Sequence, residues 1–146
     1  MPRGDISREF RSPPAAFRPS RQSLLHIPVL RHKAALNLRA GDALSALGLA
    51  DPAASRYYYA LFQAAVHALT QRGWTPGRVR SGAVEWDHSM VMNNVAVIRG
   101  RRSDRVLYGA MRELRELADY HGDLIAPGAL ATQVAAVRDF VEEVIR

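Results

Sequence analysis

Apolar residues recur at steps of three and four positions along most of residues 30–146, and this helical period is the strongest constraint on the fold. Four stretches carry it, and each is long enough for several helical turns. A fifth stretch, residues 85–98, is ambiguous, because its apolar residues fit a helix while VAVI (95–98) could form a strand. The residues expected on the buried stripes are Leu36, Ala40, Ala43, Leu44 and Leu47; Tyr58, Leu61, Phe62, Ala65 and Leu69; Val106, Leu107, Ala110, Met111, Leu114, Leu117 and Ala118; and Leu130, Val134, Val137, Val141 and Val144.

Turn and capping residues separate these stretches. Asp51 can cap the free amides at the start of a helix, and Pro52 suits a first helical position. Gly48 and Gly73 are expected to end helices, and Ser103 is a candidate cap for the next one. Five helices with short connections predict an all-α fold, an antiparallel bundle of four to five helices.

The positive charge of the chain is concentrated near its N-terminus. The formal net charge is +6, and residues 1–39 account for all of it, with seven arginines and one lysine against two acids. Residues 1–22 combine Pro, Arg and Ser without an apolar period, so we expect a flexible basic arm before a helical domain at 23–146. Residues 72–105 carry a second excess, seven arginines against three acids. Both segments could bind a polyanion such as a nucleic acid, although basic tails also occur as merely solvated segments.

The composition of the chain excludes several classes of protein and of binding site. The chain has no cysteine, so disulfides and cysteine-based zinc sites are excluded. Its His, Asp and Glu residues lack the spacing of metal ligands, and no glycine-rich loop suits a phosphate, so we expect no metal and no cofactor. The longest early apolar run, LLHIPVL (24–30), is too interrupted for a signal peptide, and nothing approaches the roughly 20 apolar residues of a membrane span. We therefore expect a cytoplasmic protein without a membrane partner.

Two segments on separate expected helices resemble motifs of one family. SRYYYALF (55–62) resembles the SRxYYAxF motif of small prokaryotic HEPN-domain proteins, and RELADY (115–120) resembles the RxxADY motif that ends a later helix in the same proteins. Between them, His88 and Ser89 occupy the place of a His-Ser pair often found there. The order, the helix placement and the spacing of about 60 residues all match, and the resemblance covers about residues 30–146.

The resemblance implies a HEPN-like bundle of four or five helices that commonly forms a homodimer. Many HEPN proteins are ribonucleases, often toxins paired with a nucleotidyltransferase-type antitoxin, and many others have no activity. We therefore expect an RNA-directed protein of a toxin–antitoxin or defence system, and the resemblance leaves two alternatives for its activity. One is a metal-independent ribonuclease, and the other is a non-catalytic module that binds a nucleotide, a nucleic acid or a nucleotidyltransferase partner. A plain helical oligomerisation domain remains a third interpretation. The family often has His after the Phe of its first motif, where this chain has Gln63, with His67 one helical turn further on.

Arg115 and His121 are the candidate catalytic pair. The ribonuclease signature of the family is Arg, four to six residues, then His, in which the imidazole moves a proton and the guanidinium stabilises charge on the phosphoryl oxygens. Arg21 and His26 have the same kind of spacing outside the motifs, so the spacing alone is not specific. On a continuous helix His121 would point about 120° away from Arg115, whereas a helix end at Gly122 would free it to turn back. The alternative is that His121 only contacts the last carbonyls of its helix.

The other candidate residues have expected roles in binding or in holding helices together. Arg56 and Asp119 are expected to form a pair between helices, with Arg115 as a second partner of Asp119. One or two of the tyrosines at 57–59 should enter the core, and Tyr59 is the candidate for stacking on a base. Tyr120 is expected in the core or as a binding residue; the modified tyrosine of some HEPN toxins follows the family His by two residues, whereas Tyr120 precedes His121, so that role is not carried over. His88 is expected to cap a helix or lie in a loop, with a place in the site as the alternative.

Overall fold

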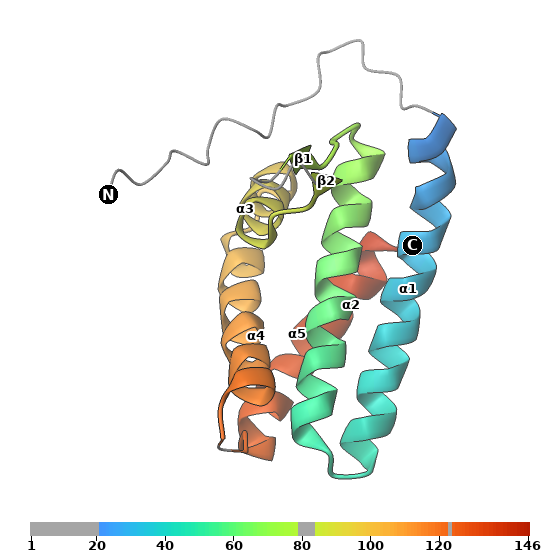
Figure 1. Ribbon diagram of the computed structural model, residues 1–146. Helices are drawn as coiled ribbons and strands as arrows, with labels where there is room; N and C mark the ends of the chain where they lie inside the picture. Colours follow the sequence, from blue (N-terminus) through green and yellow to red (C-terminus); the bar gives the residue numbers. More distant parts are fainter. Residues whose placement is uncertain (1–20, 79–83, 123) are drawn as a thin grey trace.

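The computed structural model describes residues 21–78, 84–122 and 124–146, and it confirms the predicted all-α bundle (Figure 1). A short antiparallel hairpin of strands β1 (Gly77–Arg78) and β2 (Val84–Glu85) connects the second helix to the third, with Gly77 opposite Glu85. Of the predicted arm, residues 1–20 lie outside the described part, and the first helix begins at Arg21. The helices are α1 (Arg21–Ala46), α2 (Ala50–Gln71), α3 (His88–Arg99), α4 (Arg102–Tyr120) and α5 (Pro127–Val144).

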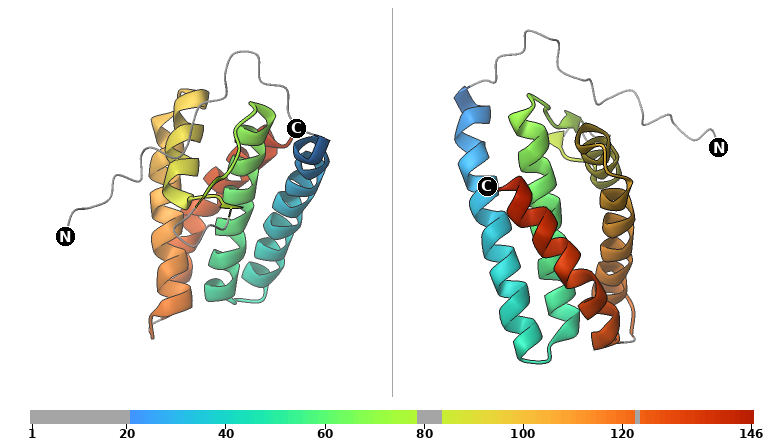
Figure 2. Two further views of the ribbon diagram at one scale, coloured as in Figure 1. Left: turned by 45° about the horizontal axis from the view of Figure 1, so that its top comes forward. Right: turned by 180° about the vertical axis from the view of Figure 1, so that it is seen from behind.

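Helix α2 is the centre of the bundle, because it contacts each of the other four helices. Figure 2 shows α1 beside it on one side, α4 on the other, and α5 running obliquely across the back. Burial on several sides explains why α2 buries more than the single stripe predicted for it. The predicted Tyr58, Leu61, Ala65 and Leu69 are buried, and so are Tyr57, Ala54, Ala64 and Val66 on other sides of the helix.

The buried face of α1 differs from the predicted one. Leu36 is 45% exposed and Leu47 is 74% exposed, whereas Ala34, Leu38 and Gly41 face the core. Two of these three residues are small, and at Gly41 α1 lies too close to α2 for a side chain: a Cβ added there would lie 2.8 Å from the ring of Tyr57. Ala43 is exposed as well, whereas Ala40 and Leu44 are half-buried and Leu44 packs against the core, so the predicted stripe on this helix was only partly correct.

The outer helices follow the predicted stripes in part. On α5, Leu130, Val137 and Val141 are buried as predicted. On α4, Leu107 and Met111 are buried, but Val106 is 72% exposed and Leu117 is 41% exposed, which corrects the prediction for both. The predicted stripe was wider than the single flank that α4 packs against its neighbours. Among the described residues, no helix is long and apolar enough to cross a membrane.

Several helix ends also differ from the predicted ones. Helix α2 begins at Ala50, and Asp51 does not cap it; its carboxylate instead accepts a hydrogen bond of 3.0 Å from the backbone N–H of Ile125, which ties the α4–α5 connection to α2. Helix α4 begins at Arg102 without a side-chain cap, so the prediction for Ser103 was wrong. The segment that could have been a strand is helical, and Asp87 caps α3 by accepting from the Met90 N–H at 2.8 Å.

Candidate functional site

The middle of α2, the start of α3 and the second half of α4 bring the motif residues together. SRYYYALF lies on α2, His88 and Ser89 open α3, and RELADY ends α4. These three segments are far apart in the sequence, yet their side chains form one connected group. We call this group the Arg115 cluster, and its members are Ser55, Tyr58, Tyr59, Phe62, His88, Tyr108, Arg112, Arg115, Asp119 and Tyr120.

Arg115 is the hub of this cluster. Its Nε donates to a carboxylate oxygen of Asp119 at 3.1 Å, and its Nη2 donates to the hydroxyls of Tyr59 at 3.2 Å and Tyr120 at 3.5 Å. The guanidinium carbon also lies 5.2 Å from the ring centre of Tyr58 and 5.4 Å from that of Tyr59, within cation–π range. The side chain is 18% exposed, so a positive charge is held in place at a partly open surface.

The protonation of Arg115 follows from these neighbours. Burial lowers the pKa of its guanidinium, whereas the nearby Tyr59 and the hydrogen bond to Asp119 raise it, and the net shift is upward. Arg115 therefore carries its charge throughout the physiological pH range. A fixed charge of this kind suits the recognition of phosphate oxygens, not proton transfer.

The predicted pair of Arg56 and Asp119 does not form. Asp119 instead accepts a hydrogen bond of 2.6 Å from Ser55 Oγ, in addition to the bond from Arg115. Arg56 lies one position along α2, about 100° around the helix, and its Nη1 donates to Asn37 Oδ1 on α1 at 3.3 Å. The expected link between α2 and α4 therefore exists, but Ser55 makes it. The prediction of Arg115 as a partner of Asp119 is confirmed.

His88 belongs to the cluster as the half-buried end of a chain of polar groups that leads into the core. Its Nδ1 is hydrogen-bonded to the hydroxyl of Tyr58, which in turn lies 2.9 Å from the hydroxyl of Tyr108. The imidazole also stacks on Phe62, with ring centres 4.0 Å apart and planes 11° from parallel. Capping of α3, the role expected for His88, is carried out by Asp87.

The charge state of His88 is set by the same surroundings. Burial lowers the pKa of its imidazole, and the positive charges of Arg115 and Arg112 lower it further, against an opposing effect of Asp87. His88 is therefore neutral near pH 7 and has a nitrogen able to accept a proton. Neither Tyr108 nor Ser55 has a role predicted from the sequence, and the only signal for Ser55 is its position inside the first motif.

His121 stands apart from the partners of Arg115. Helix α4 ends at Tyr120, as predicted, and His121 follows in an extended conformation with φ −109° and ψ 152°. Its side chain is exposed, and the hydrogen bonds of the Arg115 guanidinium go to Asp119, Tyr59 and Tyr120. The other pair with this spacing, Arg21 and His26, has side chains that lie outside the described ones.

The tyrosines divide as the helical period predicts. Tyr57 and Tyr58 are buried, which confirms that one or two of the three enter the core, and the Tyr57 hydroxyl donates to Asp42 on α1 at 2.8 Å. Tyr59 is half-buried beside Arg115, while Tyr120 is 72% exposed and is not a core residue. Gln63 accepts from Asn37 Nδ2 at 2.8 Å and so links α2 to α1.

The cluster combines a fixed cation with accessible aromatic rings, and this combination can hold a phosphate beside a base. Within the described ranges, no group of three His, Asp or Glu residues could hold a metal ion. No model of a known protein family matches the chain, and no curated protein matches it.

Proposed function

We propose that the chain is a HEPN-type protein that acts on RNA, and that the Arg115 cluster is its RNA-binding site. The supporting observation is that residues of both motifs gather around one guanidinium, with His88 joined to the same group through the Tyr58 hydroxyl. Packing alone does not need a charged side chain held at a partly open surface by residues of two helices. A site for an anion explains it.

RNA fits the chemistry of the cluster better than a simple anion does. The guanidinium can bind phosphate oxygens through its N–H groups, and Tyr120, exposed next to it, offers a ring on which a base can stack. Arg112 adds a second cation, held by Glu116 at 3.1 Å and by Ser89 at 3.0 Å. Tyr59 and Asp119 orient Arg115, while Arg56 lies 5.7 Å from the Tyr59 ring at the edge of the cluster.

Metal-independent RNA cleavage is the second candidate function, and the neutral imidazole of His88 in the same cluster as Arg115 favours it. In such a reaction the ribose 2′-hydroxyl attacks the adjacent phosphate while a histidine accepts its proton and an arginine stabilises the phosphoryl oxygens. The P–O5′ bond then breaks, which leaves a 2′,3′-cyclic phosphate on one strand and a 5′-hydroxyl, protonated by the imidazolium or by water, on the other. His88 has the required charge state, and exposed His121 is the other candidate. A cytoplasmic toxin or defence role, a homodimer and a nucleotidyltransferase-type antitoxin belong to this proposal through the family resemblance.

Binding is tested first, by the fluorescence anisotropy of a labelled single-stranded RNA with the full-length protein. We expect Arg115→Ala to weaken binding about tenfold or more, since it removes charge-assisted hydrogen bonds. Arg39→Ala is the matched control, because it removes the same charge from the exposed surface of α1. Equal affinities of the two variants, at equal melting temperatures, would overturn the assignment of the site.

Cleavage is tested separately with the same RNA in the presence of EDTA. We expect cleavage, where it occurs, to be lost in His88→Ala or His121→Ala and in Arg115→Ala, and to persist in Arg39→Ala. Growth arrest on expression, relieved by the same variants, would support a toxin. RNA binding without cleavage in the wild-type protein would leave the non-catalytic module as the function.

A further inference from the structure

A row of arginines follows the flank of α4 that faces α3. Arg102, Arg105 and Arg112 fall within about 80° of one another around the helix axis, at 100° per residue. Helices α3 and α4 are joined by the short connection at residues 100–101 and pack against each other, and this flank of α4 lies along their line of contact. We call this line of contact, with its three arginines, the α3–α4 seam.

Hydrogen bonds from α4 to α3 hold two of these arginines in the seam. Arg112 Nη1 donates to Ser89 Oγ at 3.0 Å, and Arg105 Nε donates to Asn93 Oδ1 at 2.8 Å. Ser89 and Asn93 are one turn apart on α3, so the two arginines are held in sequence along the seam. Because only the Nε of Arg105 is used, its two terminal nitrogens remain available to a ligand.

The seam ends in a pocket of about 380 Å³ at the α3–α4 connection. Its lining includes Asn93 and Val97 of α3, Gly100, and three arginines, Arg101, Arg102 and Arg105. Arg101 is bound by both oxygens of Glu143, at 2.7 and 3.0 Å. Arg102 is exposed and has no hydrogen bond or ion pair with any other described residue.

Cations outnumber carboxylates around this pocket. Asp104 is paired with Arg99 at 2.8 Å, and Glu143 is shared by Arg99 and Arg101. Within the described part of the chain, neither Arg102 nor Arg105 has a carboxylate partner. Two guanidinium groups that line one pocket without a counter-ion are suited to the oxygens of a phosphate.

We propose that this pocket is a phosphate-binding subsite, and that it holds a backbone phosphate of the RNA strand whose neighbouring nucleotides reach the Arg115 cluster. Arg102 and Arg112 are ten residues apart, about 15 Å along the helix, so the seam suits several nucleotides of single strand. The second half of this inference rests on the proposed function. The first half, phosphate binding in the pocket, does not.

The pocket is tested directly by titrating the ¹⁵N-labelled full-length protein with inorganic pyrophosphate and following the backbone amide signals. We expect saturable shifts of the amides of residues 100–105, and their loss in Arg102→Glu, which breaks no contact among the described residues. Saturable shifts in that variant, or their absence in the wild-type protein, would overturn the subsite. This outcome does not depend on whether the protein binds RNA.

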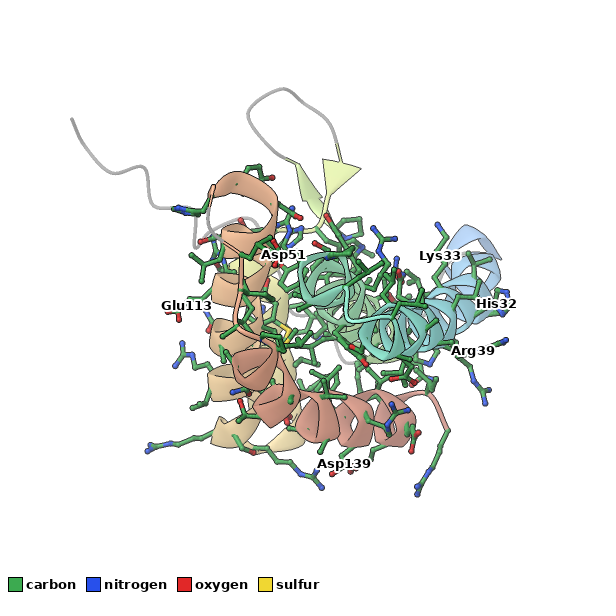
Figure 3. All side chains as sticks on the ribbon, turned by 90° about the horizontal axis from the view of Figure 1, so that it is seen from below. His32, Lys33, Arg39, Asp51, Glu113 and Asp139 are labelled. Carbon is green, nitrogen blue, oxygen red and sulfur yellow. The ribbon has the colours of Figure 1, made fainter. Side chains whose placement is uncertain are left out.

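The RNA path is tested with a fluorescent single-stranded RNA of about 12 nucleotides, near the upper range of common site sizes. We expect Arg102→Ala with Arg105→Ala to weaken binding about tenfold and to reduce the slope of log K against log salt by about 1.4, since two phosphate contacts are lost. Arg39→Ala is the control, because Figure 3 shows Arg39 on α1, on the side away from α4. An unchanged slope in the double variant would overturn the path.

The failure of the proposed function is distinguishable from the failure of this inference. RNA binding that is lost in Arg115→Ala but unchanged in the double variant would retain the Arg115 cluster and refute the path along the seam. Pyrophosphate shifts in the wild-type protein, together with RNA binding that is unchanged in Arg115→Ala, would retain the subsite and refute the proposed function.

Discussion

Replacing Asp119 by alanine should destabilise the bundle, because this carboxylate links α4 to α2. The hydrogen bond from buried Ser55 contributes about 1.5 kcal/mol, as expected for a bond to a charged group. The ion pair with Arg115 is a one-turn pair, and the Asp119 side chain is 33% exposed, so it adds about 0.4 kcal/mol. Alanine's higher helix propensity returns up to about 0.6 kcal/mol. We therefore expect a net loss of about 1 to 1.5 kcal/mol in the free energy of unfolding.

The assay is urea unfolding followed by far-UV circular dichroism, with two double-mutant cycles. With an m-value of about 2 kcal/mol per molar urea, Asp119→Ala should lower the midpoint by about 0.6 M. The cycle of Ser55→Ala with Asp119→Ala should give a coupling energy of about 1 kcal/mol or more, since the two side chains are bonded directly. The cycle of Arg56→Ala with Asp119→Ala should give less than about 0.3 kcal/mol, since Arg56 bonds to Asn37.

A larger coupling energy for Arg56 than for Ser55 would refute this reasoning. It would mean that the pair predicted from the sequence forms in solution, and that α2 is rotated relative to its position described here. Equal and small couplings in both cycles would mean instead that Asp119 is held only by Arg115.

Three further predictions concern packing, protonation and a connection between helices. Gly41→Ala should lower the free energy of unfolding by about 1–3 kcal/mol, because the added methyl group would meet the Tyr57 ring at 2.8 Å. Gly109→Ala, with nothing within 4 Å of the added Cβ, should raise it by up to about 1 kcal/mol. Urea unfolding measures both variants, and equal effects would contradict the close approach of α1 to α2 at Gly41. In an NMR titration the His88 imidazole should show a pKa below its usual value of about 6.5. Its contribution to the stability of the fold is then present above pH 6.5 and is lost as the pH falls toward the folded-state pKa. A midpoint above 6.5 would contradict its burial beside Arg115. Asp51→Ala should lower the free energy of unfolding by about 1–2 kcal/mol, because it leaves the Ile125 N–H without its acceptor. Ser103→Ala should change it by less than about 0.5 kcal/mol, because Ser103 caps no helix. A larger loss in Ser103→Ala than in Asp51→Ala would indicate that Ser103 caps α4, as the sequence predicted.

The helical period predicted the elements of this fold more reliably than it predicted their faces. The end of α4 at Tyr120 and the buried Val137 and Val141 of α5 follow from period and turn residues alone. The buried face of α1 does not follow from the period, because several large apolar residues of α1 lie at positions that do not face α2. Gly41 faces the core because α1 approaches α2 closely, and this distance depends on the partner helix.

The candidate site shows a similar limit at the level of single side chains. The motifs indicated which segments meet, and Arg115, Tyr59 and His88 do lie together in the structure. They did not indicate that Ser55, not its neighbour Arg56, reaches Asp119. Adjacent residues on a helix point about 100° apart, so the choice between them depends on the rotation of α2 within the bundle.

Charge pairing gives the two arginine regions different roles in the proposed binding of RNA. Arg115 and Arg112 each have a carboxylate one turn further along α4, Asp119 and Glu116, both at 3.1 Å. Each pair is close to neutral at a distance, so these arginines act through short-range hydrogen bonds and set the position of a nucleotide. Arg102 and Arg105 have no carboxylate partner among the described residues, and their field extends further into solution. Arg102 and Arg105 should therefore dominate the salt dependence of RNA binding, while Arg115 should dominate the preference for one geometry of the bound nucleotide.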